Sequence, residues 1–349
     1  MKLVVDHFCE ITSLLAPWTD QQFYSLDQVT VDPDTVYVIG REQCRTQPEL
    51  VRAMCDQAQV VFSNPAEGSE TFLGHLQQYG LMDLALQHKL KCIVGGDIGS
   101  EFQSIKYNHF LAQVFCYQEN SNAANRIDEI FEKKLKPHSF LFLNGRARWH
   151  RTWLIDELTN AGALDSALWT CLQGNHIKYL PARYEVEQFA HNVDQPCSAG
   201  FVKNQLFNNL WGEIYLNPEP YIDTYFSVVT ETVFAGPHSF FTEKIAKPLA
   251  QGHPFIAVAN AGFYRDLHDL GFHTFDPWID ESFDAIQDPM QRLARIKDIV
   301  VDLTQSDLVK LLEQCREVCK YNQQHLRRLS QQIPRDFPAE FFQLINERP

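Results

Sequence analysis

The stretch FFTEKIAKPLAQGHPFIAVANAG, residues 240–262, combines the signals of a capped helix with a charged triplet. Thr242 is placed to accept a hydrogen bond from a backbone N–H of the first turn, and Glu243 suits the positive end of the helix dipole. Gly252, followed closely by a proline, ends the helix. Lys244 is different, because a cation in the first turn opposes the dipole by up to about 1 kcal/mol. The triplet is either a cap alone or part of a site where an anion meets Lys244 and the helix N-terminus.

A second cationic segment, NGRARWHR at 144–151, follows an apolar run and precedes a helical one. That is where α/β proteins hold phosphates, and Arg146 and Arg151 can each grip phosphate oxygens in a bidentate fork. Between residues 133 and 151 the chain carries six cations, which on an acidic protein favours a pocket for a small anion: Lys133, Lys134, Lys136, Arg146, Arg148 and Arg151. The alternative is a solvated basic surface that neutralises the acidic helix after it.

Carboxylates accompany these cations. Glu231 ends a predicted strand shortly before Glu243, and together with the cations they would form a mixed site, with cations for a diphosphate and carboxylates for sugar or ribose hydroxyls. A buried salt-bridge cluster is the alternative. Asp32 and Asp34 form an Asp-x-Asp triplet, the pattern by which many metal-dependent sugar transferases hold a metal-bound diphosphate, but Pro33 and the strand after it favour a β-turn. We predict no metal site.

These residues need a frame that brings them together. Strand-like runs alternate with helical stretches, at 35–40, 59–64, 91–97, 139–143, 224–232 and 254–260, with a short strand FHTF at 272–275. The alternation predicts parallel sheets with helices on both faces, and loops facing a ligand at 40–45, 64–71 and 95–101. A helical tail follows at about 289–332, whereas 165–220 has no clear pattern. We expect an α/β protein with two Rossmann-like domains facing a cleft, residues 1–135 and 136–349.

The composition limits the function. The 349 residues carry a formal charge of −14, which argues against general binding of nucleic acid or anionic membranes, because such surfaces need a basic excess. Nine cysteines, odd in number and scattered, are typical of reduced thiols in a cytoplasmic protein. The first apolar segment is interrupted by Asp6 and Glu10, so we predict neither a signal peptide nor a membrane span.

In order and spacing, these motifs resemble a GT-B glycosyltransferase, and in particular the α-1,3-fucosyltransferase family with its bacterial and viral relatives. LNGRARWHRTWLIDEL looks like the family's strand, loop and arginine-bearing helix, with Arg151 at the matching place. VVTET with Glu231 stands for a strand that ends in Phe-Glu-Asn, and FFTEKIAKPLAQGHPFIAVAN is similar to the Thr-Glu-Lys helix and its Gly-x-Pro turn. The resemblance covers about residues 139–285. The chain departs from the family in Thr230-Glu231-Thr232 and in Pro248.

The resemblance implies a carboxyl-terminal domain that binds a nucleoside-diphosphate sugar, with a GDP-sugar as the first expectation. Arg151 and Lys244 would hold the diphosphate, Glu243 the ribose or sugar hydroxyls, and Glu231 would lie beside the donor sugar. Asn144, Arg146 and Thr242 complete the predicted donor site. Transfer would need neither a metal nor a tightly bound cofactor, since cations and a helix end can stabilise the departing diphosphate.

The acceptor hydroxyl needs a general base, which we expect from the amino-terminal, acceptor-side domain. Asp97 and Glu101 in the loop GGDIGSE are preferred over Glu67 and Glu70. The acceptor itself stays open between a glycan, a protein and a small molecule. Two alternatives remain, a nucleotide- or sugar-phosphate-binding protein without a competent base, and a metal-dependent transferase that uses Asp32 and Asp34.

Overall fold

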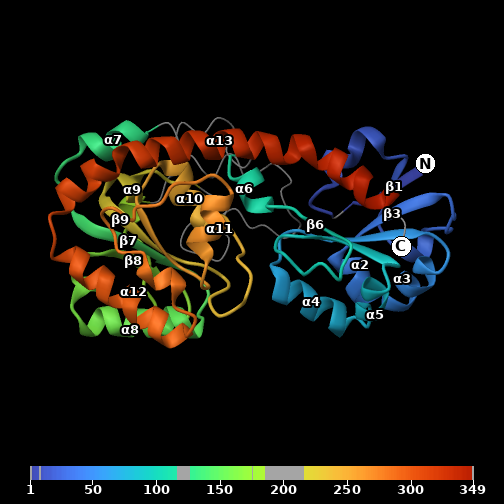
Figure 1. The fold of residues 1–349 in the computed structure, drawn as a ribbon, viewed down its shortest axis with the longest axis horizontal. Coiled ribbons are helices and arrows are strands. Elements are labelled where there is room, and N and C mark those ends of the chain that lie inside the picture. Colours follow the sequence, from blue (N-terminus) through green and yellow to red (C-terminus); the bar gives the residue numbers. More distant parts are fainter. Residues whose placement is uncertain (1, 8, 116–125, 175, 185–215, 348–349) are drawn as a thin grey trace. The chain divides into compact units, whose positions relative to one another are not determined.

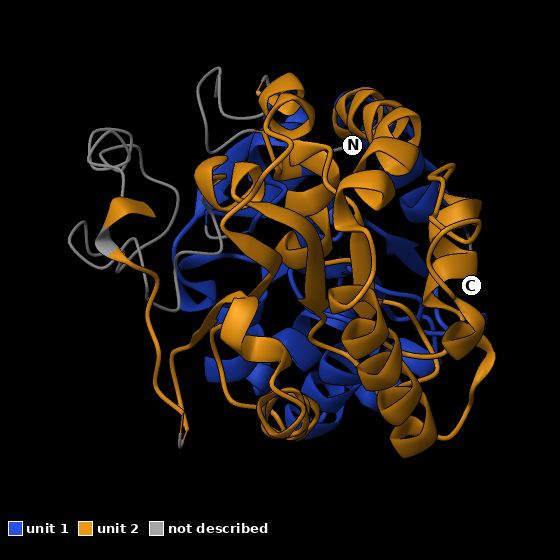
Figure 2. Cartoon of the chain, turned by 90° about the vertical axis from the view of Figure 1, so that its left-hand side faces the viewer, with its two compact units in different colours: residues 1–112, 331–349 blue, residues 113–330 orange. Residues whose placement is uncertain are grey.

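A computed structural model describes the chain except residues 1, 8, 116–125, 175, 185–215 and 348–349 (Figure 1). The fold is α/β, with two sheets of parallel strands, compatible with two Rossmann-like domains. The chain divides into two compact units, shown in different colours in Figure 2. Unit 1 comprises residues 1–112 and 331–349, and unit 2 comprises residues 113–330. Part of the unpatterned segment 165–220 lies outside the described residues.

Unit 1 is built on a six-stranded parallel sheet of order β2-β1-β3-β4-β5-β6. Apolar, β-branched runs form its central strands, as predicted at 35–40 and 59–64, because a parallel sheet buries both of its faces. The strands are β1 (Lys2–Asp6), β2 (Gln21–Phe23), β3 (Thr35–Gly40), β4 (Gln59–Asn64), β5 (Leu90–Val94) and β6 (Ser104–Lys106). The helices are α1 (Thr12–Leu15), α2 (Arg41–Thr46), α3 (Pro48–Cys55), α4 (Ser69–Gln78), α5 (Met82–Leu86) and α6 (His109–Gln113).

Two apolar clusters cover the two faces of this sheet. Successive side chains of one strand alternate between them, so that Phe62 joins one cluster and Val61 the other. The first cluster takes its α-helical side chains from α2, α3, α4 and α5. The second is closed by the end of α13 (Leu308–Asn346), through Phe337, Phe341, Leu344 and Ile345.

The end of α13 is also held through its carbonyls. The Lys91 ammonium donates to the carbonyls of Leu344, at 2.5 Å, and Glu347, at 2.7 Å, and the Gln59 amide donates to that of Ile345, at 2.6 Å. A cation suits the negative end of a helix dipole. Residues 331–349 therefore belong to unit 1, whereas the sequence placed them in the second of two domains divided at 135/136. The helical tail predicted to end near 332 is longer, and it is interrupted between residues 304 and 308.

Unit 2 is built on a four-stranded parallel sheet of order β10-β9-β7-β8. Its strands are β7 (His138–Asn144), β8 (Leu168–Cys171), β9 (Thr224–Thr230) and β10 (Phe255–Val258). Its helices, besides α13, are α7 (Ile127–Glu132), α8 (Trp149–Asn160), α9 (Glu219–Ile222), α10 (Glu243–Gln251), α11 (Phe263–Asp269) and α12 (Pro289–Thr304). In Figure 1, α8 and α12 lie on one side of the sheet, and α9 and α10 lie on the other. The predicted strand at 272–275 is wrong, because these residues pair with no strand.

Two further observations concern the cysteines and the apolar character of the helices. Seven described cysteines are buried and form no disulfide: Cys9, Cys44, Cys55, Cys92, Cys171, Cys315 and Cys319. Within the described ranges, no helix combines the length and the apolar character needed to cross a membrane.

Candidate functional site at the carboxyl edge of the unit 2 sheet

The strand order of unit 2 reverses next to β7. The chain passes from β7 to β8 on one side, returns across β7 to β9, and continues outward to β10. In open parallel sheets, ligands bind beyond the carboxyl ends of the two strands where the order reverses. Here those ends carry Asn144 on β7 and Thr230 on β9, with Glu231 directly after β9. The topology thus gathers three residues from the two predicted motifs at the edge where a ligand is expected.

Asn144 has a buried donor that the protein leaves unused. Asn144 is only 2% exposed. The Thr230 hydroxyl donates to its side-chain oxygen Oδ1 at 2.7 Å, and this contact fixes the amide so that Nδ2 points elsewhere. Nδ2 is buried without a hydrogen-bond partner among the described residues. Buried polar groups normally have a partner, so an unpartnered donor at the switch point indicates a place for a ligand or water.

Arg151 is a second buried donor at the same edge. Its Nη2 donates to the carbonyls of Thr230, at 2.9 Å, and Glu231, at 3.2 Å, and Nη1 donates to that of Arg146, at 3.0 Å. Nε is buried and has no hydrogen-bond partner in the described part of the chain. Burial, and next the charge of Arg148, lower the pKa of Arg151 to about 10, so the guanidinium remains charged at neutral pH. Arg151 is only 3% exposed and its guanidinium is held by these hydrogen bonds, so it is a cation with a fixed position.

Glu231 is fully buried and caps α10. Oε1 accepts hydrogen bonds from the backbone N–H of Thr242, at 3.2 Å, and of Ile245, at 3.3 Å. Oε2 accepts from the N–H of Thr232, at 3.1 Å, and from the Thr242 hydroxyl, at 2.6 Å. Burial raises the pKa of Glu231 and the charge of Lys244 opposes this, while four donors favour the ionised form. The anion that this helix N-terminus attracts is therefore supplied by the chain itself.

The predicted cap of α10 is confirmed. Thr242 Oγ1 accepts from the N–H of Lys244 at 3.2 Å, and Gly252 ends the helix with a φ of 68°. The Lys244 ammonium forms an ion pair with Glu243, and it lies 3.3 Å from the Thr242 hydroxyl. Burial raises the pKa of Glu243, but Lys244 outweighs this and the pKa falls below its ordinary value. The cation that looked out of place thus has a carboxylate partner in its own helix.

The arginines of the β7–α8 loop are not paired in this way. Arg146 is exposed and Arg148 is half-buried, with its Nε buried and unpartnered. In the described part of the chain, neither forms an ion pair, and nor does Arg151. Elsewhere the arginines commonly do, as Arg52 does with Asp83. Three arginines that form no ion pair with a described residue therefore gather at the carboxyl end of β7, and the charges of Glu231 and Glu243 act on one of them, Arg151.

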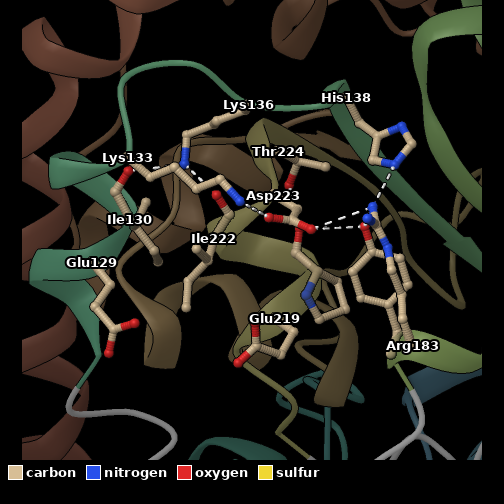
Figure 3. A network of polar contacts seen from close by, with 12 residues as sticks. Glu129, Ile130, Lys133, Lys136, His138, Arg183, Glu219, Ile222, Asp223 and Thr224 are labelled. Atoms are coloured by element: carbon tan, nitrogen blue, oxygen red, sulfur yellow. Dashed lines mark hydrogen bonds and ion pairs between the residues drawn. The ribbon is translucent and has the colours of Figure 1, made fainter.

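The lysines of the predicted cationic cluster lie elsewhere. Lys133 pairs with Asp223, and the Lys136 ammonium donates to the carbonyls of Ile130, at 2.8 Å, and Ile222, at 2.7 Å (Figure 3). Both contacts lie near the start of β7 and β9, while the arginines follow the end of β7. A seven-residue strand separates the two groups by about 20 Å. The prediction of one cationic pocket from residues 133–151 is therefore wrong for the lysines.

The Asp223 network is complete by itself. Besides Lys133, the carboxylate accepts from the Tyr184 hydroxyl at 2.9 Å and forms an ion pair with Arg183 at 3.4 Å (Figure 3). Burial, followed by the charge of Lys133, lowers the pKa of Lys136 to about 7. Every charged group here already contacts protein atoms, so the network stabilises the amino end of the sheet.

In unit 1, Asp97 and Glu101 follow β5 and are exposed. Asp97 Oδ1 accepts the N–H of Gly99 at 2.8 Å, which is a turn contact, and their role as general base stays a prediction. A different carboxylate, Glu10, lies near the reversal of strand order between β1 and β3. Burial, and then the charges of Asp6 and Glu67, raise the pKa of Glu10 to about 7.

Asp32 and Asp34 form the β-turn that the sequence favours. The N–H of Thr35 donates to the carbonyl of Asp32 at 3.0 Å, and the N–H of Asp34 donates to its Oδ1 at 3.0 Å. The N–H of Asp34, and next the Thr35 hydroxyl, which donates to Oδ2 of Asp32 at 3.1 Å, hold the pKa of the Asp32 carboxyl below its ordinary value. Among the described residues, no group of three or more His, Cys, Asp or Glu is arranged to hold a metal ion.

Some residues of this edge carried no signal in the sequence. His150 Nε2 lies 3.2 Å from the carbonyl of Glu231, and burial lowers the pKa of this imidazole to about 3, so it is neutral and donates to that carbonyl. Asn260, just after β10, has a buried and unpartnered Oδ1. Only a strand-end position distinguishes such residues in a sequence.

Comparison with known proteins adds no relative, since no family model, no curated protein and no solved structure matches this chain.

Proposed function

We propose that the chain is a glycosyltransferase that moves a sugar from a nucleoside-diphosphate sugar to an acceptor hydroxyl, with the diphosphate at the carboxyl edge of the unit 2 sheet. One observation carries the proposal. Among the described residues, Asn144 Nδ2 and Arg151 Nε at the reversal of strand order are buried donors without hydrogen-bond partners, and the nearby arginines form no ion pair. Two of the three motifs of the fucosyltransferase-like resemblance, LNGRARWHRTWLIDEL and VVTET, meet at the same place, and that resemblance makes a GDP-sugar the first donor to test.

The chemistry follows from charge. When the bond between sugar and diphosphate breaks, negative charge grows on the leaving phosphate oxygen. Fixed cations and N–H donors stabilise that charge without having to reorganise. Arg151 is suited to this, since three carbonyls hold its guanidinium in place. Lys244 can join only by exchanging Glu243 for the phosphate, which would free Glu243 for a ribose or sugar hydroxyl.

Glu231 takes a different part in this proposal from the one the resemblance implies. Its four hydrogen bonds leave no free acceptor, so it acts by positioning α10 and the residues around it. The same observation favours a second candidate, a binding protein for nucleotides or sugar phosphates that performs no transfer. That protein would keep the anion site and lack a competent base.

Calorimetric titration with GDP, UDP, ADP and CMP tests the site. Asn144→Asp keeps the oxygen that accepts from Thr230 but replaces the unpartnered donor with a charged oxygen. We expect it to weaken diphosphate binding at least about tenfold. Asn160→Asp, an exposed change of equal charge at the end of α8, is the control. The site is wrong if no nucleotide binds the wild type, or if both variants bind alike.

Turnover separates the two candidates. A transferase should release GDP from a GDP-sugar when an acceptor, or slowly when water, takes the sugar, whereas a binding protein should return the donor unchanged. The assay is run with and without a chelator and with Asp34→Ala. A transferase of the proposed kind should tolerate both, because Asp34 is exposed and outside the site. Loss of activity with the chelator, or in Asp34→Ala, would support the metal-dependent alternative.

A further inference from the structure

Trp149 is a large aromatic residue that the protein leaves half in solvent. It is the first residue of α8 and is 49% exposed, although the next two residues, His150 and Arg151, are buried. Indole rings bury much apolar surface when they can. Here the exposed ring stands immediately after Arg148, beside the edge of the sheet at which the anion site lies.

The orientation of the indole follows from its neighbours. The rings of His150 and Phe234 are stacked, with centroids 5.0 Å apart and planes at 15°. Trp149 stands at 74° to Phe234 and at 82° to His150, with centroid distances of 5.4 Å and 5.7 Å. A ring that is nearly perpendicular to both members of a stack and similarly distant from both lies across their edges. The indole therefore packs beside this pair, and its 49% exposure leaves the ring surface directed away from the pair (the open face) in solvent.

The support under Trp149 is rigid. Phe234 is buried, and the guanidinium of Arg292 lies 4.6 Å from its ring centroid. Arg292 is itself fully buried and donates to the carbonyls of Ala259, at 3.0 Å, and Ile286, at 2.6 Å, as well as to that of Phe234. The open indole face is therefore held in place before any ligand arrives, which reduces the entropy lost on binding.

We propose that the open face of Trp149 is the stacking platform for the base of a nucleotide whose phosphates meet Asn144, Arg148 and Arg151. The inference rests on the proposed function and adds a base subsite to it. A flat aromatic surface next to arginines that form no ion pair with the described residues suits a ligand that joins an aromatic ring to phosphate, and every nucleobase offers a face for stacking. Stacking on Trp149 would thus contribute to binding of any nucleobase and would not discriminate between them.

Two probes separate base from phosphate, namely GDP and inorganic pyrophosphate, titrated by calorimetry into wild type, Trp149→Ala and Trp149→Phe. We expect Trp149→Ala to bind GDP about 5- to 150-fold more weakly, the range that stacking of one base spans. Pyrophosphate should bind it as it binds the wild type, and Trp149→Phe should recover part of the loss. Trp18→Ala is the matched control, because Trp18 is 47% exposed and also packs edge-to-face on a phenylalanine, Phe342.

The outcomes distinguish this inference from the proposed function. If GDP binds Trp149→Ala as it binds the wild type, while Asn144→Asp still weakens it, the anion site stands and the base platform is wrong. An equal loss of GDP and pyrophosphate would show that Trp149 acts through the fold, and would overturn the platform too. A third probe, glucose 1-phosphate, tests whether a sugar ring, and not a base, packs on Trp149. If Trp149→Ala weakens binding of glucose 1-phosphate more than binding of GDP, base stacking is excluded. If the wild type binds none of the probes, the proposed function fails as well.

Discussion

The Glu231 carboxylate accepts a hydrogen bond from the backbone N–H of Ile245, at 3.3 Å, and so joins the end of β9 to the first turn of α10. The same side chain contacts the N–H groups of Thr232 and Thr242, which flank the connecting loop. One buried charge therefore fixes both ends of the loop that lies beside the candidate site. A residue that looks catalytic by its position in the sequence is, by its contacts, a structural anion.

Replacing Glu231 should loosen α10. Glu231→Ala leaves four donors without an acceptor, and we expect a loss of at least about 3 kcal/mol in the free energy of unfolding. Glu231→Gln retains one oxygen and should lose less. Hydrogen exchange of peptides covering 240–252 measures the effect, with the exposed Glu317→Ala as control. Unchanged exchange in Glu231→Ala would show that the cap is not formed in solution.

Gly252 should tolerate no side chain. Its φ is 68°, and a Cβ built there would lie 2.1 Å from Cδ1 of Ile127. Gly80 has a φ of 67° with no atom near a Cβ, so Gly80→Ala measures the backbone cost alone, about 1–2 kcal/mol. Gly252→Ala should cost about 1–3 kcal/mol more, through the clash. Thermal unfolding of the two variants compares them, and equal losses would mean that Ile127 moves aside freely.

Acid should destabilise unit 2 through His253. This imidazole is buried, and burial lowers its pKa to about 3, while the unfolded chain keeps about 6.5. Below pH 6.5 the imidazole is protonated in the unfolded state but stays neutral in the folded state. The stability that the buried His253 contributes is therefore lost as the pH falls from 6.5 toward 3. At pH 5 the loss is about 2 kcal/mol.

Unfolding midpoints at pH 7.5 and pH 5 check this sign. His253→Gln should be less stable than the wild type at pH 7.5, because it disturbs contacts to Ser227 and Thr224, yet it should lose less on acidification. An exposed change that removes no titratable group, Gln57→Ala, should lose as much stability on acidification as the wild type. An identical acid loss in the wild type and His253→Gln would contradict the buried neutral imidazole.

Local patterns in the sequence predicted much of the fold. The central strands at 35–40 and 59–64 carry β-branched, apolar runs that only a doubly covered parallel sheet can bury, and the structure has them at these positions. The α10 cap was predictable because Thr242 and Gly252 act on their own backbone within one turn. Such features depend on neighbours in the chain, and a sequence displays those directly.

Long-range placement could not be predicted in this way. Lys136 and Arg146 lie only ten positions apart, but a strand runs between them and carries them to opposite ends of the sheet. Likewise, the four donors around Glu231 come together only when β9 and α10 pack, so its charge looked available in the sequence. Asn144 becomes a candidate ligand-binding residue only because the strand order reverses beside it, and the sequence does not show that order.

The return of residues 331–349 to unit 1 has a consequence for biosynthesis. The apolar face that Phe337, Phe341 and Leu344 cover is made within residues 1–112, before unit 2, and its cover is made only after unit 2. On the ribosome, the first unit must wait for the whole of the second to be translated before its sheet is closed on both faces. During that interval an apolar surface is available to chaperones, and also to wrong partners. The final helix thus sets the moment at which the first domain can complete its folding.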